Sequence, residues 1–139
     1  MVVDMKDHDE FKKFCKESES KVICLDFDGV IHKNSKGFHD GTIYDEPIEG
    51  ALENIKALNM QNYTLVIHTC KANPKRPLVN GKTGIELVRG WLKKYNVSKY
   101  IKDVTYIKPN AICYIDDKGI RFDNWTQCME ELVKFDITT

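Results

Sequence analysis

The chain has 139 residues, and its 21 basic and 21 acidic side chains leave a formal net charge of zero. This length is typical of one domain, and the balanced charge does not require nucleic acid or a membrane surface as a partner. No apolar run approaches the roughly 20 residues of a membrane span, and the charged start lacks the apolar centre of a signal peptide. Five scattered cysteines include no C-x-x-C pair, so a thiolate zinc site is not indicated. We therefore expect one cytoplasmic domain over residues 1–139.

Helix and strand signals alternate along the chain. A first helix is expected within residues 1–20, where Asp7 and Glu10 have the spacing of a capping box ahead of apolar residues at helical intervals. Apolar runs predict four strands, and periodic stretches behind a proline or a capping residue predict three more helices. In chain order these are strand 21–27, helix 48–61, strand 63–69, helix 83–95, strand 104–107, strand 111–116 and helix 125–135.

The apolar runs of the main predicted strands are continuous rather than alternating, as in residues 21–27 and 63–69. This pattern is typical of parallel strands that are covered on both faces. Strands separated by helices indicate the same arrangement. We therefore predict an α/β fold with a doubly wound, Rossmann-like parallel sheet and helices on both faces.

Polar residues close the predicted strands, at the edge where such sheets bind ligands. They are Asp26 and Asp28 after the first strand, Thr69 after the second, and Asp116 and Asp117 after the fourth, with Lys108 just before the fourth. Carboxylates within about 4 Å of one another repel by roughly 4 kcal/mol per pair at an effective dielectric constant near 20. A hard divalent ion such as Mg²⁺ is the natural counter-ion for such a cluster.

The segments DFDGV, HT, KP and YIDD, which end at residues 30, 69, 109 and 117, together resemble the four motifs of the haloacid dehalogenase (HAD) superfamily, in the same order. The resemblance covers roughly residues 22–122. It implies roles for five residues: Asp26 as nucleophile, Asp28 as general acid and base, Thr69 as a phosphate-binding hydroxyl, Lys108 as a charge-neutralising lysine and Asp116 as a metal ligand. We extend the predicted metal set to Asp26, Asp28, Asp116 and Asp117. Lys108 lies only eight residues before Asp116, so Lys71 and Lys102 stay open as alternatives for the lysine.

The chemistry agrees with these residue types. An aspartate with a pKa of about 3.9 is ionised at neutral pH and can attack phosphorus, provided that Mg²⁺ and a lysine offset the charge of the phosphate. Asp28 would protonate the leaving alcohol and then deprotonate the hydrolytic water. Expulsion of a halide needs no such proton, so dehalogenase chemistry is disfavoured. We expect an Mg²⁺-dependent phosphomonoester hydrolase that forms an aspartyl-phosphate.

The intervals between the motifs leave no room for the cap domain that relatives usually insert. The site should therefore be open and bordered by residues 32–46 and 71–82, with His32 and His39 in an exposed loop. An open site suits a nucleic-acid end or a phosphoprotein, and a small phosphate ester would need walls from a neighbouring subunit. Two non-enzymatic alternatives remain, a phospho-acceptor like a receiver domain and a binding scaffold. A receiver would place its Lys-Pro pair last, whereas here the pair at 108–109 precedes Asp116.

Overall fold

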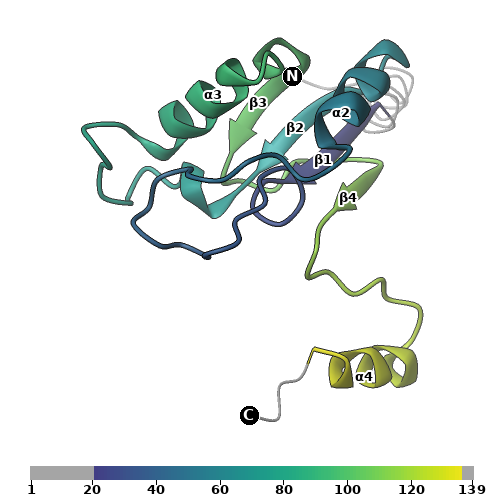
Figure 1. The fold of residues 1–139 in the computed structure, drawn as a ribbon. Helices are drawn as coiled ribbons and strands as arrows, with labels where there is room; N and C mark the ends of the chain where they lie inside the picture. Colours follow the sequence, from purple (N-terminus) through teal and green to yellow (C-terminus); the bar gives the residue numbers. More distant parts are fainter. Residues whose placement is uncertain (1–20, 136–139) are drawn as a thin grey trace, which may run out of the picture.

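The computed structural model describes residues 21–135, so the helix expected within residues 1–20 lies outside the described residues. Four strands form one sheet in the order β3-β2-β1-β4 (Figure 1). They are β1 (Val22–Asp26), β2 (Thr64–His68), β3 (Ile101–Thr105) and β4 (Cys113–Ile115). All three strand pairings are parallel. The predicted Rossmann-like α/β class is therefore confirmed.

The strand register brings the carboxyl ends of the central strands to one edge. Asp26 at the end of β1 pairs with His68 at the end of β2, and Leu25 pairs with Ile115 at the end of β4. The chain builds β2 and β3 on one side of β1 and then returns to place β4 on the other side. The gap between β1 and β4 is thus the switch point at which such sheets bind ligands.

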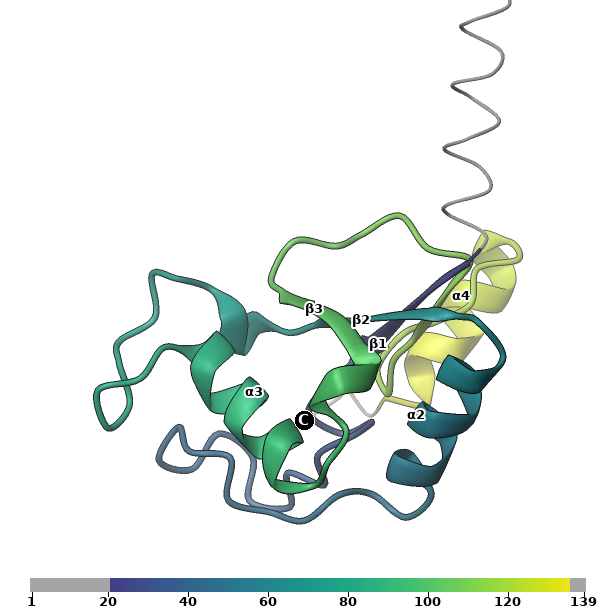
Figure 2. The same ribbon diagram turned by 90° about the horizontal axis from the view of Figure 1, so that it is seen from above.

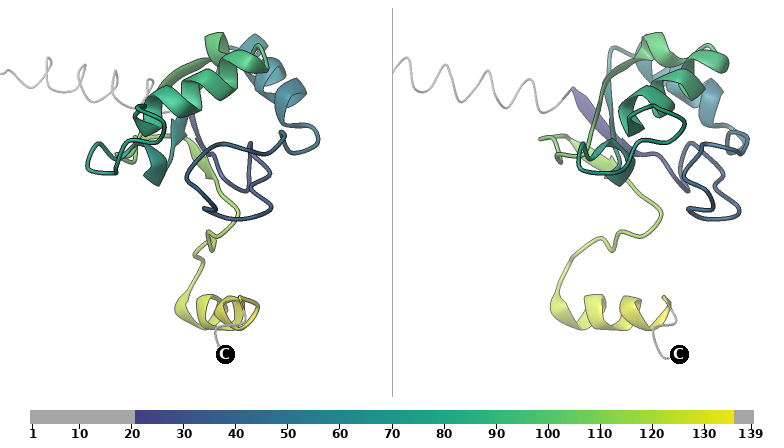
Figure 3. Two further views of the ribbon diagram at one scale, coloured as in Figure 1. Left: turned by 60° about the vertical axis from the view of Figure 1, so that its left-hand side comes forward. Right: turned by 90° about the vertical axis from the view of Figure 1, so that its left-hand side faces the viewer.

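We predicted helices on both faces of the sheet, and within residues 21–135 the two helices that pack on it share one face. α2 (Ala51–Met60) and α3 (Gly84–Lys94) lie on the same face of the sheet (Figures 1 and 2). Right-handed crossovers from β1 to β2 and from β2 to β3 run in the same direction, and this places both helices on one side. The return to β4 through residues 106–112 contains no helix. α4 (Trp125–Val133) stands apart from the sheet (Figure 3), and none of its residues is buried.

The core lies between the sheet and these two helices. Alternate residues of the strands, such as Leu25 and Ile67, face Ile55 of α2 and Leu92 of α3. All four side chains are buried. Along α3 the buried residues are Val88, Trp91 and Leu92, whereas Ile85 in the first turn is exposed.

The starts of α2 and β3 differ most from the predictions, and each difference has a physical reason. α2 begins at Ala51 rather than at residue 48, because Gly50 has a φ of 86° and so cannot continue a right-handed helix. β3 begins at Ile101, before the predicted start at residue 104. It is an edge strand and carries the exposed residues Lys102 and Asp103, which interrupt the apolar run. Within residues 21–135, no helix has the length and apolar character needed to cross a bilayer.

Candidate active site

Three carboxylates meet at the switch point of the sheet. Asp26 is the last residue of β1, and Asp116 and Asp117 follow β4 directly. One oxygen atom from each carboxylate lies within 4.8 Å of the others. Burial raises the pKa of Asp26 to about 6, and the charges of Asp116 and Asp117 add to the rise, although the Phe27 amide donates a hydrogen bond of 2.8 Å to its carboxylate. Negative charge is therefore concentrated at this edge of the sheet.

This cluster fits a divalent cation by donor type and spacing. Carboxylate oxygens are the ligands that Mg²⁺ prefers, and two oxygens on one Mg²⁺ lie at most about 4.2 Å apart. The separations in the cluster, up to 4.8 Å, would close by small rotations of the side chains. A cation at this point would also remove the repulsion that raises the pKa of Asp26. Three of the four predicted metal ligands are therefore together.

Gly29 allows one of these acids to approach the turn after β1. Its φ is 86°, in the left-handed region, and a Cβ atom on it would lie 2.2 Å from Oδ2 of Asp117. Any side chain at this position would therefore displace Asp117. The glycine of the DFDGV segment has a steric role in the acid cluster.

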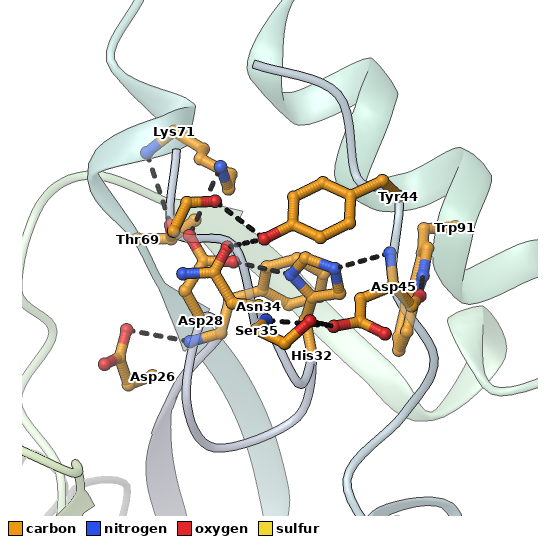
Figure 4. Close-up of polar contacts among 12 residues, drawn as sticks. Asp26, Asp28, His32, Asn34, Ser35, Tyr44, Asp45, Thr69, Lys71 and Trp91 are labelled. Carbon is orange, nitrogen blue, oxygen red and sulfur yellow. Dashed lines mark hydrogen bonds and ion pairs between the residues drawn. The ribbon is translucent and has the colours of Figure 1, made fainter. Parts of the chain in front are cut away.

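The carboxylate of Asp28, the fourth predicted ligand, is bonded to two other residues instead (Figure 4). Its Oδ1 atom lies 2.8 Å from Nδ1 of His32, and its Oδ2 atom lies 3.3 Å from Nζ of Lys71. Burial alone would raise the pKa of Asp28, but the hydrogen bond from His32 and the charge of Lys71 hold it below its ordinary value. Asp26 and Asp28 therefore have opposite electrostatic surroundings in one pocket.

His32 is a site residue that the sequence did not reveal. We expected an exposed loop histidine, and this was wrong, because its side chain has no exposed surface. The turn after β1 causes the burial, since the amides of Ile31 and His32 both donate to the carbonyl of Phe27 at 2.9 Å. The imidazole ring then stacks on Phe27, with ring centroids 5.4 Å apart. The only local signal was the spacing of four residues between Asp28 and His32.

The surroundings of His32 also define its tautomer. The backbone N–H of Asp45 donates a hydrogen bond of 3.1 Å to Nε2 of His32, so Nε2 is the acceptor. The Nδ1 atom therefore carries the hydrogen and donates a hydrogen bond to Asp28. Asp45 is held in place by Trp91 of α3, whose Nε1 atom donates to the Asp45 carbonyl at 3.0 Å. Hydrogen bonds from the side chain and backbone of Ser35 lower the pKa of Asp45 to about 2. Residues 33–46 and α3 thus orient the histidine.

Thr69 and Lys71 line the same pocket as the acid cluster. Thr69 follows β2 and caps the short 3₁₀ helix η1 (Cys70–Ala72), where its hydroxyl accepts a hydrogen bond of 3.2 Å from the amide of Lys71. Both residues are buried, with 4% and 7% of their surface exposed. The turn of η1 directs Lys71 into the pocket beside Asp28 (Figure 4).

The other two candidate lysines occupy different places. Nζ of Lys108 lies 4.3 Å from the centroid of the Tyr114 ring, and Lys108 lines a neighbouring pocket with Asp26 and Asp116. Lys102 is an exposed residue of β3 and lines neither pocket. Of the three lysines, the structure places only Lys71 among the residues that line the pocket with Asp28 and Thr69.

The pocket that contains these groups has a volume of about 590 Å³. It is lined by the acid cluster, Asp28, Thr69 and Lys71. Phe38 from the loop 33–46 and Arg76 from the loop 73–82 border it. The two loops predicted to border the site therefore do so.

Comparisons with known proteins give information on the fold alone. No family model and no curated protein matches the chain. A solved structure, described as that of a conserved protein coded by a locus from Bacteroides thetaiotaomicron, is similar to it with a TM-score of 0.52 and 18% sequence identity. The match covers 86% of this chain and 93% of the other. At this identity the similarity supports the α/β fold alone.

Proposed function

We propose that the protein is an Mg²⁺-dependent phosphomonoester hydrolase that acts through an aspartyl-phosphate. The observation that carries this proposal is the carboxylate cluster of Asp26, Asp116 and Asp117 in one pocket with the buried Thr69 and Lys71. A fourth carboxylate, that of Asp28, lines the same pocket but is held apart by its own partners. The resemblance of the motif order to the HAD superfamily supports the same chemistry.

Asp26 would be the nucleophile. Its carboxylate oxygen forms a bond to phosphorus while the bond from phosphorus to the leaving oxygen breaks, so the phosphoryl group moves onto Asp26. Mg²⁺, when bound by the carboxylate cluster, supplies positive charge that offsets the repulsion between carboxylate and phosphate. Lys71 and the Thr69 hydroxyl would bind the remaining phosphoryl oxygens, and we assign to Lys71 the charge-neutralising role that the sequence left open.

Asp28 would move the protons. Its carboxyl group takes up a proton when a phosphate dianion binds beside it, because a neighbouring negative charge favours the protonated form. It gives this proton to the leaving alkoxide in the first step. In the second step it accepts a proton from the attacking water, whose oxygen bonds to phosphorus as the bond to Asp26 breaks. The hydrogen bond from Nδ1 of His32 would keep the carboxylate of Asp28 in position for both proton transfers.

The test is turnover of p-nitrophenyl phosphate by the full chain with Mg²⁺ and with EDTA. We expect activity only with Mg²⁺, and none in Asp26→Asn, which keeps the shape of the nucleophile. Acid-quenched wild-type protein should also carry one covalent phosphoryl group by intact mass, and the variant should carry none. Asp103→Asn, an exposed residue of β3 outside the pocket, serves as the matched control and should be fully active. Full activity in EDTA, or in folded Asp26→Asn, would contradict the proposal.

A further inference from the structure

A second pocket adjoins the candidate active site. Its volume is about 520 Å³, within the range of small-molecule sites. It shares Phe38, Lys71 and Arg76 with the pocket of the candidate active site, which we call the catalytic pocket. A bound molecule could therefore have its phosphate at the acid cluster and its remaining bulk in the second pocket.

The walls of this second pocket are mainly apolar. The residues that carry no charge include Phe38 and Gly41 from the loop 33–46, Pro77 and Val79 from the loop 73–82, and Leu87 from α3. A Cβ atom on Gly41 would lie 3.1 Å from Val79 and 3.3 Å from the Phe38 ring, so this glycine lets the two loops approach each other. The pocket is thus built by close packing of the two loops.

Phe38 gives the pocket a surface for stacking. The side chain is a large hydrophobic group with 62% of its surface exposed. Nζ of Lys71 and Cζ of Arg76 lie 5.8 and 5.9 Å from the centroid of its ring. These two cations lie over the ring, and the exposed remainder of the ring offers an aromatic surface in a positively charged setting, on which proteins stack nucleobases.

We propose that the second pocket binds the nucleobase of a nucleoside phosphate, stacked on Phe38, while the phosphate lies at Asp26. This inference rests on the proposed function and names its substrate class. Lys71 lies between the two parts, since its ammonium group is 3.3 Å from Asp28 and 5.8 Å from the centre of the Phe38 ring. In this arrangement the sugar would link a phosphate on one side of Lys71 to a base on the other. Asp40, which also lines the pocket, offers a carboxylate that can accept a hydrogen bond from a base N–H group.

Other phosphate esters match this arrangement less well. A sugar phosphate has no planar apolar part to cover Phe38, Val79 and Leu87. In phosphotyrosine the ring is attached directly to the phosphate oxygen, so it would lie within the catalytic pocket and leave the second pocket empty. A nucleoside phosphate has both the planar ring and the spacer.

The experiment compares kcat/KM for four substrates with Mg²⁺: nucleoside monophosphates, an oligonucleotide with a terminal phosphate, ribose 5-phosphate and a phosphotyrosine peptide. We expect one or both nucleotide substrates to exceed ribose 5-phosphate by about 5- to 150-fold, the range that stacking of one base contributes. Phe38→Ala should remove this advantage, measured as the ratio of kcat/KM for the nucleotide to kcat/KM for ribose 5-phosphate, and Phe38→Trp should keep the ratio. Leu78→Ala is the matched control, because Leu78 is also 62% exposed and lies in the loop 73–82, which borders the same pocket, but does not itself line the pocket.

The ranking of the two nucleotide substrates shows whether the natural source is a free nucleotide or a strand end. Equal values for nucleotides and ribose 5-phosphate, or a preference for the phosphotyrosine peptide, would overturn the inference and leave the proposed function intact. Inactivity on every substrate, p-nitrophenyl phosphate included, would overturn the proposed function. Binding of adenosine 5′-monophosphate to Asp26→Asn, with and without Phe38→Ala, decides the inference separately. Equal dissociation constants for the two proteins would refute it.

Discussion

Asp26 and Asp28 are separated by one residue, yet the protein shifts their pKa values in opposite directions. Asp26 is partly buried and faces Asp116 and Asp117, which raises its pKa to about 6. Asp28 has a hydrogen-bond donor in His32 and a cation in Lys71, and its pKa is lowered. Two carboxylates whose surroundings separate their pKa values are typical of a pair with different catalytic tasks.

The raised pKa of Asp26 predicts how stability without metal depends on pH. The ordinary pKa of 3.8 applies to the unfolded chain, so from about pH 4 to about pH 6 the folded protein holds a proton that the unfolded chain has released. The contribution of Asp26 to the free energy of unfolding should therefore fall as the pH rises through this window, and it should be constant above it. Urea denaturation in EDTA at several pH values should show this fall in the wild type, relative to Asp26→Asn. Parallel curves for the two proteins would refute the assignment.

Under the proposed mechanism, we expect replacement of His32 to slow the second chemical step, in which Asp28 accepts a proton from the attacking water. His32→Phe removes the hydrogen bond that Nδ1 donates to Asp28. The pKa of Asp28 should therefore rise, and its carboxylate should lose its orientation. We expect kcat to fall by about 10- to 100-fold, part of the effect of acid–base catalysis, and KM to change little. The acid limb of the kcat profile should move to higher pH, which a purely structural defect would not cause.

Two further variants control this experiment. His32→Gln keeps an N–H donor and should restore part of the activity. His39→Asn changes a histidine of the same loop that has a φ of 52°, a conformation that asparagine tolerates. It should behave as the wild type. An unshifted pH profile in an active His32→Phe protein would exclude the positioning role.

At the scale of elements, the junction of η1 and α3 positions Lys71. The amide of Lys71 donates to the Thr69 hydroxyl, and a Cβ atom on Gly84 would lie 1.5 Å from the Lys71 carbonyl oxygen. Gly84 is the first residue of α3, and Thr83 caps this helix through a capping box with Glu86. The start of α3 is therefore in direct contact with the segment that carries the lysine.

This contact predicts that Gly84→Ala lowers both stability and turnover. Helix propensity alone would favour alanine by up to about 1 kcal/mol, but the added methyl group must displace η1 and with it Lys71. Thr83→Ala is the matched variant at the same helix end and should cost about 1 kcal/mol through loss of the cap, with kcat unchanged. Thermal unfolding and steady-state kinetics of both variants measure this difference. A stabilised and fully active Gly84→Ala protein would contradict it.

At the scale of the whole molecule, the strand order creates the acid cluster. β1 is flanked by β2 and by β4, and the acids of β1 and of the segment after β4 meet because these two strands are parallel neighbours. Repulsion between these like charges destabilises the folded state unless a cation or a proton offsets it. We therefore expect metal binding and folding to be coupled.

This coupling predicts a large effect of Mg²⁺ on unfolding. An ion that binds only the folded state at 100 times its dissociation constant stabilises it by about 2.7 kcal/mol, which for this chain length is a rise of roughly 10 °C in Tm. Asp116→Asn should lose this rise, and its Tm without metal should exceed that of the wild type because repulsion with Asp26 is removed. Differential scanning calorimetry with Asp103→Asn as the control measures both effects. An Mg²⁺ shift of wild-type size in Asp116→Asn would remove Asp116 from the metal site.

Local patterns in the sequence determined the elements and part of the site. Continuous apolar runs predicted β1 and β2, and periodic stretches behind capping residues predicted α3 and α4, whose caps in the structure are Thr83 and Asn124. These signals are readable because they act between residues near in sequence. The approach of Asp26 to Asp116 was also predictable, since parallel strands bring their carboxyl ends to one edge.

The tertiary structure alone decided the surroundings of those acids. The burial of His32 depends on a turn that returns the chain beneath Asp28 and on Trp91, which lies 59 positions later in the chain. The place of Lys71 depends on η1 packing against α3, and the pocket beside Phe38 depends on two loops that meet only in the folded protein. Such contacts join residues remote in sequence, and no local pattern encodes them, because their geometry follows from the register of the sheet and the direction of its crossovers.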